Sequence, residues 1–145
     1  MAPAPSSVLG LDVGAQRIGV AAASLAAGLA RPLTTLRNDD GFLPALRKII
    51  ETENAELLVV GLPRGLDGQH TDQTRAVETF TDELRQNCDL PVHFQDEAVT
   101  SKQAEAELQS RGKPYERGDI DALAATYILE DWLAGQGSRQ EEPAA

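Results

Sequence analysis

The sequence has very few of the residues that form disulfides or stacked aromatic cores. Cys88 is the only cysteine among 145 residues, so the chain can form neither an internal disulfide nor a cysteine-based metal or redox site. Aromatic residues account for 4% of the chain and hydrophobic residues for 41%. The core must therefore consist mainly of leucine, valine, isoleucine and alanine.

Long apolar runs are also missing. No stretch approaches the roughly 20 residues that are needed to span a bilayer. The N-terminal segment MAPAPSS has neither the basic start nor the apolar centre of a secretion signal. We therefore expect a cytoplasmic protein that makes no membrane contact.

Positive charge is in deficit. The chain has 13 Lys and Arg against 23 Asp and Glu, which gives a formal net charge of −10. This balance disfavours loose binding to nucleic acid, because such binding depends on neutralising phosphates. A polyanionic substrate would need a local cluster of basic residues, whereas an acidic site would attract metal ions.

The segments that are present have the pattern of one α/β domain. We expect it over residues 8–134, between a flexible N-terminus, 1–7, and a flexible polar tail, 135–145. The predicted order β-β-β-α-β-α-β-α-α gives a five-stranded mixed sheet with helices on both faces. The expected strands are 8–14, 18–25, 31–38, 55–63 and 90–97, and the expected helices are 42–54, 71–88, 100–112 and 119–133.

Asp12 lies in, or at the end of, an otherwise apolar strand, VLGLDVG. A buried carboxylate costs free energy unless it is paired, hydrogen-bonded or bound to a metal. A turn aspartate that hydrogen-bonds its own loop would explain the residue as well. Its role therefore depends on which other groups converge on it.

The last predicted helix, DIDALAATYILEDWL, supplies a second acid on an apolar face. At about 100° per residue, Asp121 falls between Ile128 and Trp132, so it is predicted to point toward the sheet. Asp119 falls on the polar side and has the position of an N-cap. Asp131 also projects toward the apolar side, but from the last turn, where it can reach solvent.

A third acid comes from the segment HFQDEAVT, in which Asp96 and Glu97 close a predicted strand. Sites in open sheets form at the carboxyl ends of the strands. Alternation along a strand puts the two acids on opposite faces and does not choose between them. With Asp12 and Asp121, either acid would complete a carboxylate site for Mg²⁺ or Mn²⁺. Two such ions can drive phosphodiester hydrolysis.

Several basic residues lie near these acids in the chain. Arg17 is in the turn after Asp12, and Arg64 follows a predicted strand. The loop SRGKPYERG could hold a phosphate backbone and stack one base. A solvated loop with cations at a helix end explains it equally. The loop residues concerned are Arg111, Lys113, Tyr115 and Arg117.

Four segments, LGLDVGAQRIGVA, ELLVVGLPRGLDG, DEAVTSKQAEAEL and IDALAATYIL, resemble in order and spacing the YqgF family, also called RuvX. The resemblance covers nearly all of the chain from Val8 to Leu133. It implies a ribonuclease H-like fold and a two-ion site for Mg²⁺ or Mn²⁺. It also implies that Asp12, Glu97 and Asp121 form the acidic metal-binding triad, which favours Glu97 over Asp96.

The chain departs from the family at one motif. The strand-end motif is usually Asp-Glu-Arg-x-Thr-Thr, whereas here Ala98 takes the arginine position and Ser101 that of the second threonine. This bears on substrate affinity more than on metal binding. Asp96 and Thr100 of the same motif are candidates to support the ligands, and Arg17 matches the basic residue of the first motif.

The resemblance implies a metal-dependent nuclease, with 5′-end maturation of pre-16S ribosomal RNA as its first function and cleavage of Holliday junctions or branched DNA as the alternative. The expected partner is structured RNA or branched DNA. A resolvase needs a two-fold dimer, and the sequence shows no obvious dimer surface, so monomer and homodimer both stay open.

Two other classes of protein remain as alternatives. The segment DVGAQRIGV also resembles the first phosphate motif of the actin and sugar-kinase fold, but those proteins need two such domains and this chain has the length of one. A non-catalytic nucleic-acid-binding module is compatible with Ala98 and the acidic charge. The presence of all three acids argues against it.

Overall fold

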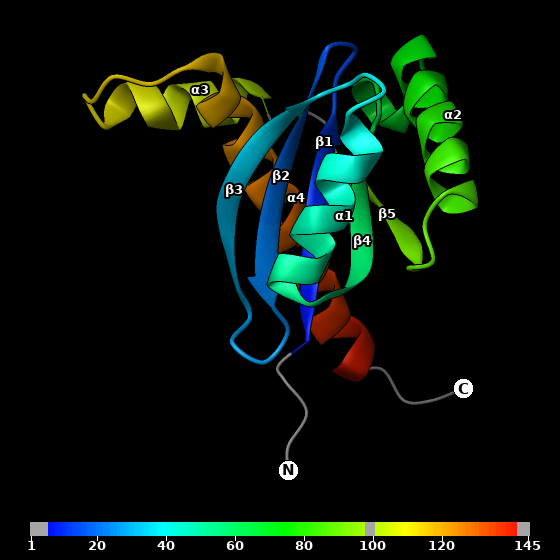
Figure 1. Ribbon diagram of the computed structural model, residues 1–145. Helices are drawn as coiled ribbons and strands as arrows, with labels where there is room; N and C mark the ends of the chain where they lie inside the picture. Colours follow the sequence, from blue (N-terminus) through cyan, green and yellow to red (C-terminus); the bar gives the residue numbers. More distant parts are fainter. Residues whose placement is uncertain (1–5, 98–100, 142–145) are drawn as a thin grey trace.

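A computed structural model describes residues 6–97 and 101–141 of the chain (Figure 1). The predicted order of strands and helices is confirmed, with one short 3-10 turn, Leu66–Gly68, added after the fourth strand. The elements are β1 (Ser7–Val13), β2 (Arg17–Ser24), β3 (Leu29–Arg37), α1 (Phe42–Glu53), β4 (Ala55–Pro63), α2 (Asp72–Gln86), β5 (Val92–Glu97), α3 (Ser101–Ser110) and α4 (Arg117–Glu141).

The five strands form one mixed sheet in the order β3-β2-β1-β4-β5. Strands β1, β2 and β3 are antiparallel neighbours, and β4 and β5 continue the sheet parallel to β1. Because β1 is paired on both sides and covered on both faces, its first residues are apolar or small and buried. The predicted five-stranded mixed sheet is thus confirmed.

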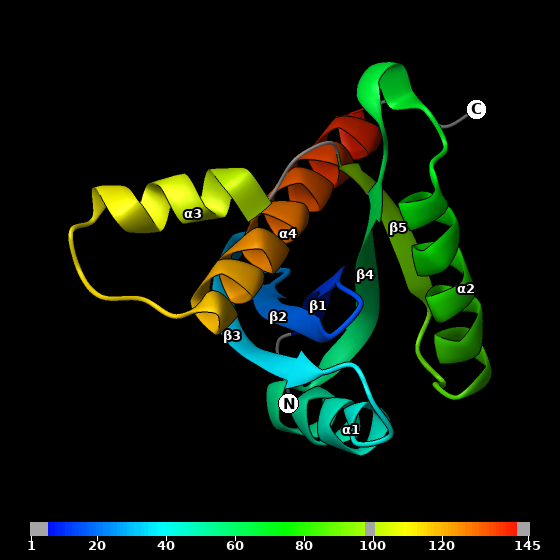
Figure 2. The ribbon, with the colours of Figure 1, turned by 90° about the horizontal axis from the view of Figure 1, so that it is seen from above.

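Helices cover both faces of the sheet, with α1 and α2 on one side and α4 on the other (Figure 2). Leu9 of β1 packs in the same cluster as Phe42 of α1. Val8 packs instead with Ile128 of α4. Because side chains alternate along a strand, Asp12 shares the α4 face with Val8. Helix α3 packs against α4 through a separate small cluster.

Helix α4 lies very close to the sheet because glycines face it. Gly19 of β2 is the register partner of Asp12. A Cβ atom at Gly19 would lie 2.0 Å from the carbonyl oxygen of Asp121, and one at Gly10 would lie 2.5 Å from Cγ of Leu129. The backbone of α4 therefore rests directly on β2, which brings the start of α4 beside the end of β1.

The prediction for the last helix was wrong at both ends. Helix α4 begins at Arg117, so Asp119 is not its N-cap but lies in its first turn, where its carboxylate accepts a hydrogen bond of 2.9 Å from the backbone N–H of Glu116. The helix extends to Glu141, so residues 135–141, predicted as tail, are helical. Two glycines there suggested a tail, but extending an existing helix avoids the cost of nucleation.

Other predictions concern the start of the first strand, the strand-end motif and membrane spans. Strand β1 begins at Ser7, one residue inside the predicted N-terminal segment. Thr100 and Ala98, which belong to the strand-end motif, lie outside the described residues. None of the helices within 6–97 and 101–141 combines the length and the apolar character needed to cross a bilayer.

Candidate active site

Asp12 lies near the carboxyl end of the central strand β1, on the face covered by α4. Burial, together with the nearby negative charge of Asp121, raises the pKa of Asp12 from 3.8 to about 6. Its position costs stability, because the charged form has lost much of its hydration. A carboxylate that is retained at such a cost is a candidate for function.

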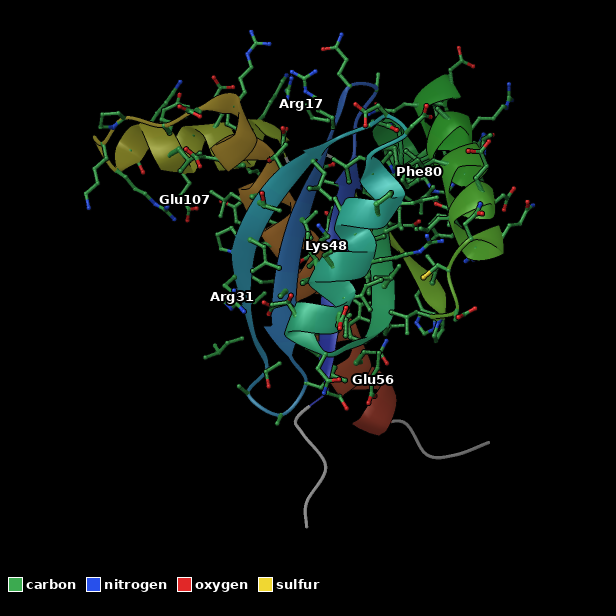
Figure 3. The ribbon with its side chains drawn as sticks, in the orientation of Figure 1. Arg17, Arg31, Lys48, Glu56, Phe80 and Glu107 are labelled. Carbon is green, nitrogen blue, oxygen red and sulfur yellow. The ribbon has the colours of Figure 1, made fainter. Side chains whose placement is uncertain are left out.

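Asp121 lies in the second turn of α4 and faces the sheet, as the helical projection predicts. The Nε atom of Arg17 donates a hydrogen bond of 2.7 Å to Oδ2 of Asp121. The side chain of Asp121 is 15% exposed and that of Arg17 is 38% exposed. Arg17 lies at the end of the sheet where β1 turns into β2 (Figure 3). The guanidinium thus neutralises one acid of the predicted triad.

Strand β5 directs Glu97 toward α4. The ring of His93 lies 6.3 Å from that of Trp132 on α4, and Glu97 shares this face by alternation. Burial is the largest cause that raises the pKa of Glu97 from 4.5 to about 8, followed by the adjoining carboxylate of Asp131 and then the charge of Asp12. Within the described residues, the buried Oε1 atom of Glu97 has no hydrogen-bond partner.

Asp96 points away from this group. The Nε atom of Arg64 lies 3.3 Å from Oδ1 of Asp96, whose side chain is 66% exposed. The structure therefore separates the two acids that the sequence left open, because Glu97 approaches Asp12 whereas Asp96 pairs with Arg64 at the surface. The role of Asp96 as a support for the ligands stays a prediction, as does that of Thr100, which lies outside the described residues.

A pocket of about 380 Å³ opens at the end of β1. Asp12 and Asp121 line it together with two cations, Arg17 and Arg117, and with Gln73 from the first turn of α2. Carboxylates and guanidinium groups thus face the same space. Such a space suits a phosphate group beside a cation held by the acids.

The donor set fits a hard divalent ion, because it consists of carboxylate oxygens. The unpartnered Oε1 of Glu97 is an orphaned buried acceptor of the kind that an ion satisfies. Over residues 6–97 and 101–141, however, no three His, Cys, Asp or Glu side chains are already arranged to hold an ion. The salt bridge from Arg17 occupies an oxygen of Asp121 that such an arrangement would use.

The candidate nucleic-acid-binding residues singled out in the sequence separate into three places. Arg17 and Arg117 line the acidic pocket. Arg64 pairs with Asp96 at the end of β4. The others line a second groove on the far side of the first turn of α4, and they are Arg111, Lys113 and Tyr115.

Sequence reasoning missed two neighbours of the site. Asp131 was expected to reach solvent, and it is exposed, but its carboxylate also adjoins Glu97. Its projection toward the apolar side of the helix was the available indication. Nothing in the sequence indicated Gln73, because its place in the pocket of Asp12 depends on how the loop between β4 and α2 folds back.

The raised pKa values of Asp12 and Glu97 predict how the metal-free protein responds to pH. Their values rise from 3.8 to about 6 and from 4.5 to about 8 on folding. Between these limits the folded chain binds more protons than the unfolded chain, so stability is present at low pH and is lost as the pH rises. We expect these two groups to make the melting temperature in EDTA fall between about pH 4 and about pH 8. An Asp12→Asn/Glu97→Gln variant should show a flatter profile, and an equally steep one would contradict the assignment.

Comparison with known proteins gives close relatives in sequence. A family model described as "RuvX: Holliday junction resolvase" matches residues 6–135. A protein of Rippkaea orientalis named "Putative pre-16S rRNA nuclease" is 40% identical over 131 residues, which cover 88% of this chain and 94% of the relative. A protein of the same name from Thermosynechococcus vestitus is 43% identical over 131 residues, covering 88% and 87% of the two chains.

Two solved structures share the fold. RuvC of T. thermophilus in complex with a Holliday junction substrate aligns with a TM-score of 0.52 and 17% identity, over 90% of this chain and 96% of that chain. The Fowlpox virus resolvase in complex with Holliday junction DNA aligns with a TM-score of 0.50 and 10% identity, over 90% and 98%. The similarity confirms the ribonuclease H-like fold, and at these identities it shows the fold alone.

Proposed function

Because the chain belongs to the RuvX family, whose model matches residues 6–135, we propose that it is a metal-dependent nuclease that hydrolyses phosphodiester bonds. The observation that carries this proposal is that Asp12 of β1 and Asp121 of α4, which are distant in the chain, line one pocket together with two arginines. Glu97 of β5 lies on the same face of the sheet by alternation, and the nearby charge of Asp12 contributes to its raised pKa.

In this proposal Asp12, Glu97 and Asp121 hold Mg²⁺ or Mn²⁺, two ions being expected. When bound, such ions supply a water of lowered pKa and stabilise the charge that develops on the phosphate. The chain itself supplies the orientation. Asp12 is fixed by the central strand and Asp121 by a helix that rests on glycine, so both carboxylates are held on rigid elements rather than on loops.

Arg17 has two roles in this proposal. Without metal, it neutralises Asp121 through the 2.7 Å contact to Oδ2, and an ion that ligates this oxygen has to displace the guanidinium. Arg17 then remains in the pocket, where it and Arg117 can bind the oxygens of the phosphate. The ion and the guanidinium therefore compete for the same carboxylate.

The competition makes Arg17→Ala a test with a readout other than cleavage. We expect the variant to bind Mn²⁺ about fivefold more tightly, because removal of a partly exposed ion pair is worth about 1 kcal/mol. Cleavage should become slower, because a phosphate contact is lost. Titration calorimetry measures the affinity, with Arg31→Ala as the control, since Arg31 pairs with Glu53 away from the pocket. Unchanged or weaker Mn²⁺ binding would refute the competition.

We propose pre-16S ribosomal RNA as the substrate and its 5′-end maturation as the reaction, which belongs to the cytoplasm. The names of the relatives from Rippkaea orientalis and Thermosynechococcus vestitus support this choice. The alternative is resolution of Holliday junctions, supported by the description of the family model. That reaction requires two active sites related by a two-fold axis.

One experiment separates these functions. The protein is incubated with Mg²⁺ or Mn²⁺ and with a precursor RNA fragment, unstructured single strands or a four-way DNA junction, and in parallel with EDTA. Ion-dependent cleavage of the precursor RNA is expected. Cleavage of the junction at symmetric positions, with RNA left intact, would favour the resolvase. Absence of cleavage on every substrate, or cleavage that persists in EDTA, would contradict the proposal.

A further inference from the structure

A groove of about 580 Å³ lies beside the acidic pocket and has no role in the reaction proposed above. It is bounded by the edge strand β3, by the loop between α3 and α4, and by the start of α4. Figure 2 shows this loop reaching the start of α4 beside β3. Residues from these walls include Pro32, Thr34, Leu108, Lys113, Tyr115 and Leu123.

The groove and the acidic pocket flank the same turn of α4. Arg117 and Asp121 line the pocket, whereas Asp119 and Leu123 line the groove. At about 100° per residue, the two pairs point about 200° apart around the helix. A strand that places a phosphate in the pocket therefore reaches the groove by crossing one helical turn.

The walls of the groove include apolar side chains. Leu108, Ala122 and Leu123 line it but are almost fully buried, whereas Pro32 and Pro114 line it and are exposed. Tyr115 is half-buried and packs against the cluster to which Leu108 and Leu123 belong. An apolar surface next to an aromatic ring suits the face of a nucleobase.

The rim of the groove carries more positive than negative charge, although the chain as a whole has a net charge of −10. Arg111 and Lys113 line it together with one acid, Asp119, whose carboxylate accepts the backbone N–H of Glu116. Arg111 lies 3.1 Å from Glu107. Among the described residues Lys113 makes no ion pair. The ammonium group of Lys113 is thus available to a phosphate.

We propose that this groove binds an unpaired nucleotide of the strand that is cut, with its base against the apolar wall and its phosphate at Lys113. The inference rests on the proposed nuclease function and specifies its substrate as single-stranded next to the bond that is hydrolysed. A base inside a duplex keeps its faces stacked on its neighbours and cannot use the apolar wall. The groove therefore selects unpaired over paired nucleic acid.

The test measures binding without cleavage, in an Asp12→Asn background with Mg²⁺. A labelled single-stranded RNA and a blunt duplex of the same sequence are compared by fluorescence anisotropy. We expect Lys113→Glu to weaken single-strand binding by about tenfold and duplex binding by less than about twofold. Lys48→Glu is the matched control, because Lys48 is exposed on α1, on the other face of the sheet (Figure 3).

A second variant tests the contact with the base. Tyr115→Ala should weaken binding of the normal single strand several-fold. It should change little when the oligonucleotide carries abasic sites, because the two deletions remove the same contact and are not additive. Lys113→Ala should also make the salt dependence shallower by about 0.7 in slope, the value for one phosphate contact on a single strand.

The inference is overturned if Lys113→Glu leaves single-strand binding unchanged, or if it weakens the duplex and the single strand equally. An equal loss with Lys48→Glu would also overturn it, since that result indicates a general charge effect. The nuclease proposal fails separately. A wild-type protein that cuts no substrate contradicts the nuclease, whereas unchanged binding by Lys113→Glu in a protein that does cut contradicts the groove alone.

Discussion

Replacing Asp12 with asparagine is expected to abolish ion-dependent cleavage and to make the metal-free protein more stable. The loss of activity should exceed about a thousandfold, because the substitution removes a charged ligand of the proposed metal site. Stability should rise because burial and the charge of Asp121 hold the pKa of Asp12 near 6, against 3.8 when unfolded. Above pH 6 this pKa difference means that the charged carboxylate lowers the free energy of unfolding by about 3 kcal/mol. The asparagine variant should regain about 2 kcal/mol of this, because burying the neutral amide also has a cost.

The measurements are single-turnover cleavage of a precursor RNA with Mn²⁺ and urea unfolding in EDTA at about pH 8. Asp96→Asn is the matched control, because Asp96 is exposed and pairs with Arg64, and it should retain most of the cleavage. Glu97→Gln should lose cleavage as Asp12→Asn does. A fully active Asp12→Asn would refute the triad, and an Asp12→Asn that is inactive because it has unfolded would refute the stability argument.

Gly19→Ala is expected to damage both the fold and the site, although it adds only one methyl group and leaves every acid in place. The new Cβ would lie 2.0 Å from the carbonyl oxygen of Asp121, so α4 must move away from β2. Overpacking of this kind costs about 3 kcal/mol. The displacement carries Asp121 away from Asp12, so cleavage should fall by at least about tenfold even where the variant is folded.

Gly135→Ala is the control for this prediction. Gly135 lies in α4, and nothing is found within 4 Å of a Cβ atom built there. The substitution should therefore stabilise the helix by about 0.5–1 kcal/mol and leave cleavage unchanged. Thermal unfolding and cleavage rates, measured for both variants, test whether the close packing of α4 is required. A Gly19→Ala protein with unaltered stability and activity would show that the close approach of α4 is not required.

The sequence was sufficient for the sheet because its patterns are local. The strand AELLVVGLP is apolar except for Glu56 near its start, and the structure buries its central residues. The helical projection of Asp121 also depends on local spacing alone, and it holds. Alternation could not separate Asp96 from Glu97, because it requires knowledge of which face α4 covers. That face is settled by contacts such as His93 with Trp132, which join residues far apart in the chain.

Other features of the structure could not be predicted from patterns in a single sequence, because they depend on contacts between distant residues. The contact between Arg17 and Asp121 joins residues 104 positions apart, so no spacing rule reaches it. The groove that contains Lys113 and Tyr115 needs β3 as its other wall. The sequence predicts too early an end for α4, because glycine has a low helix propensity. The packed part of α4 is already helical, so the helix extends through these residues without a new nucleation cost.

The way α4 crosses the sheet has a consequence for the order of events during synthesis of the chain. All five strands precede α4 in the chain. Asp121 therefore comes close to Asp12 only when this helix packs against the glycines of β1 and β2. A nascent chain that has not yet produced α4 can form hairpins and a partial sheet, but it has no complete acid cluster. In the proposed nuclease, the acidic site is therefore complete only after the last helix has been synthesised and has packed on the sheet.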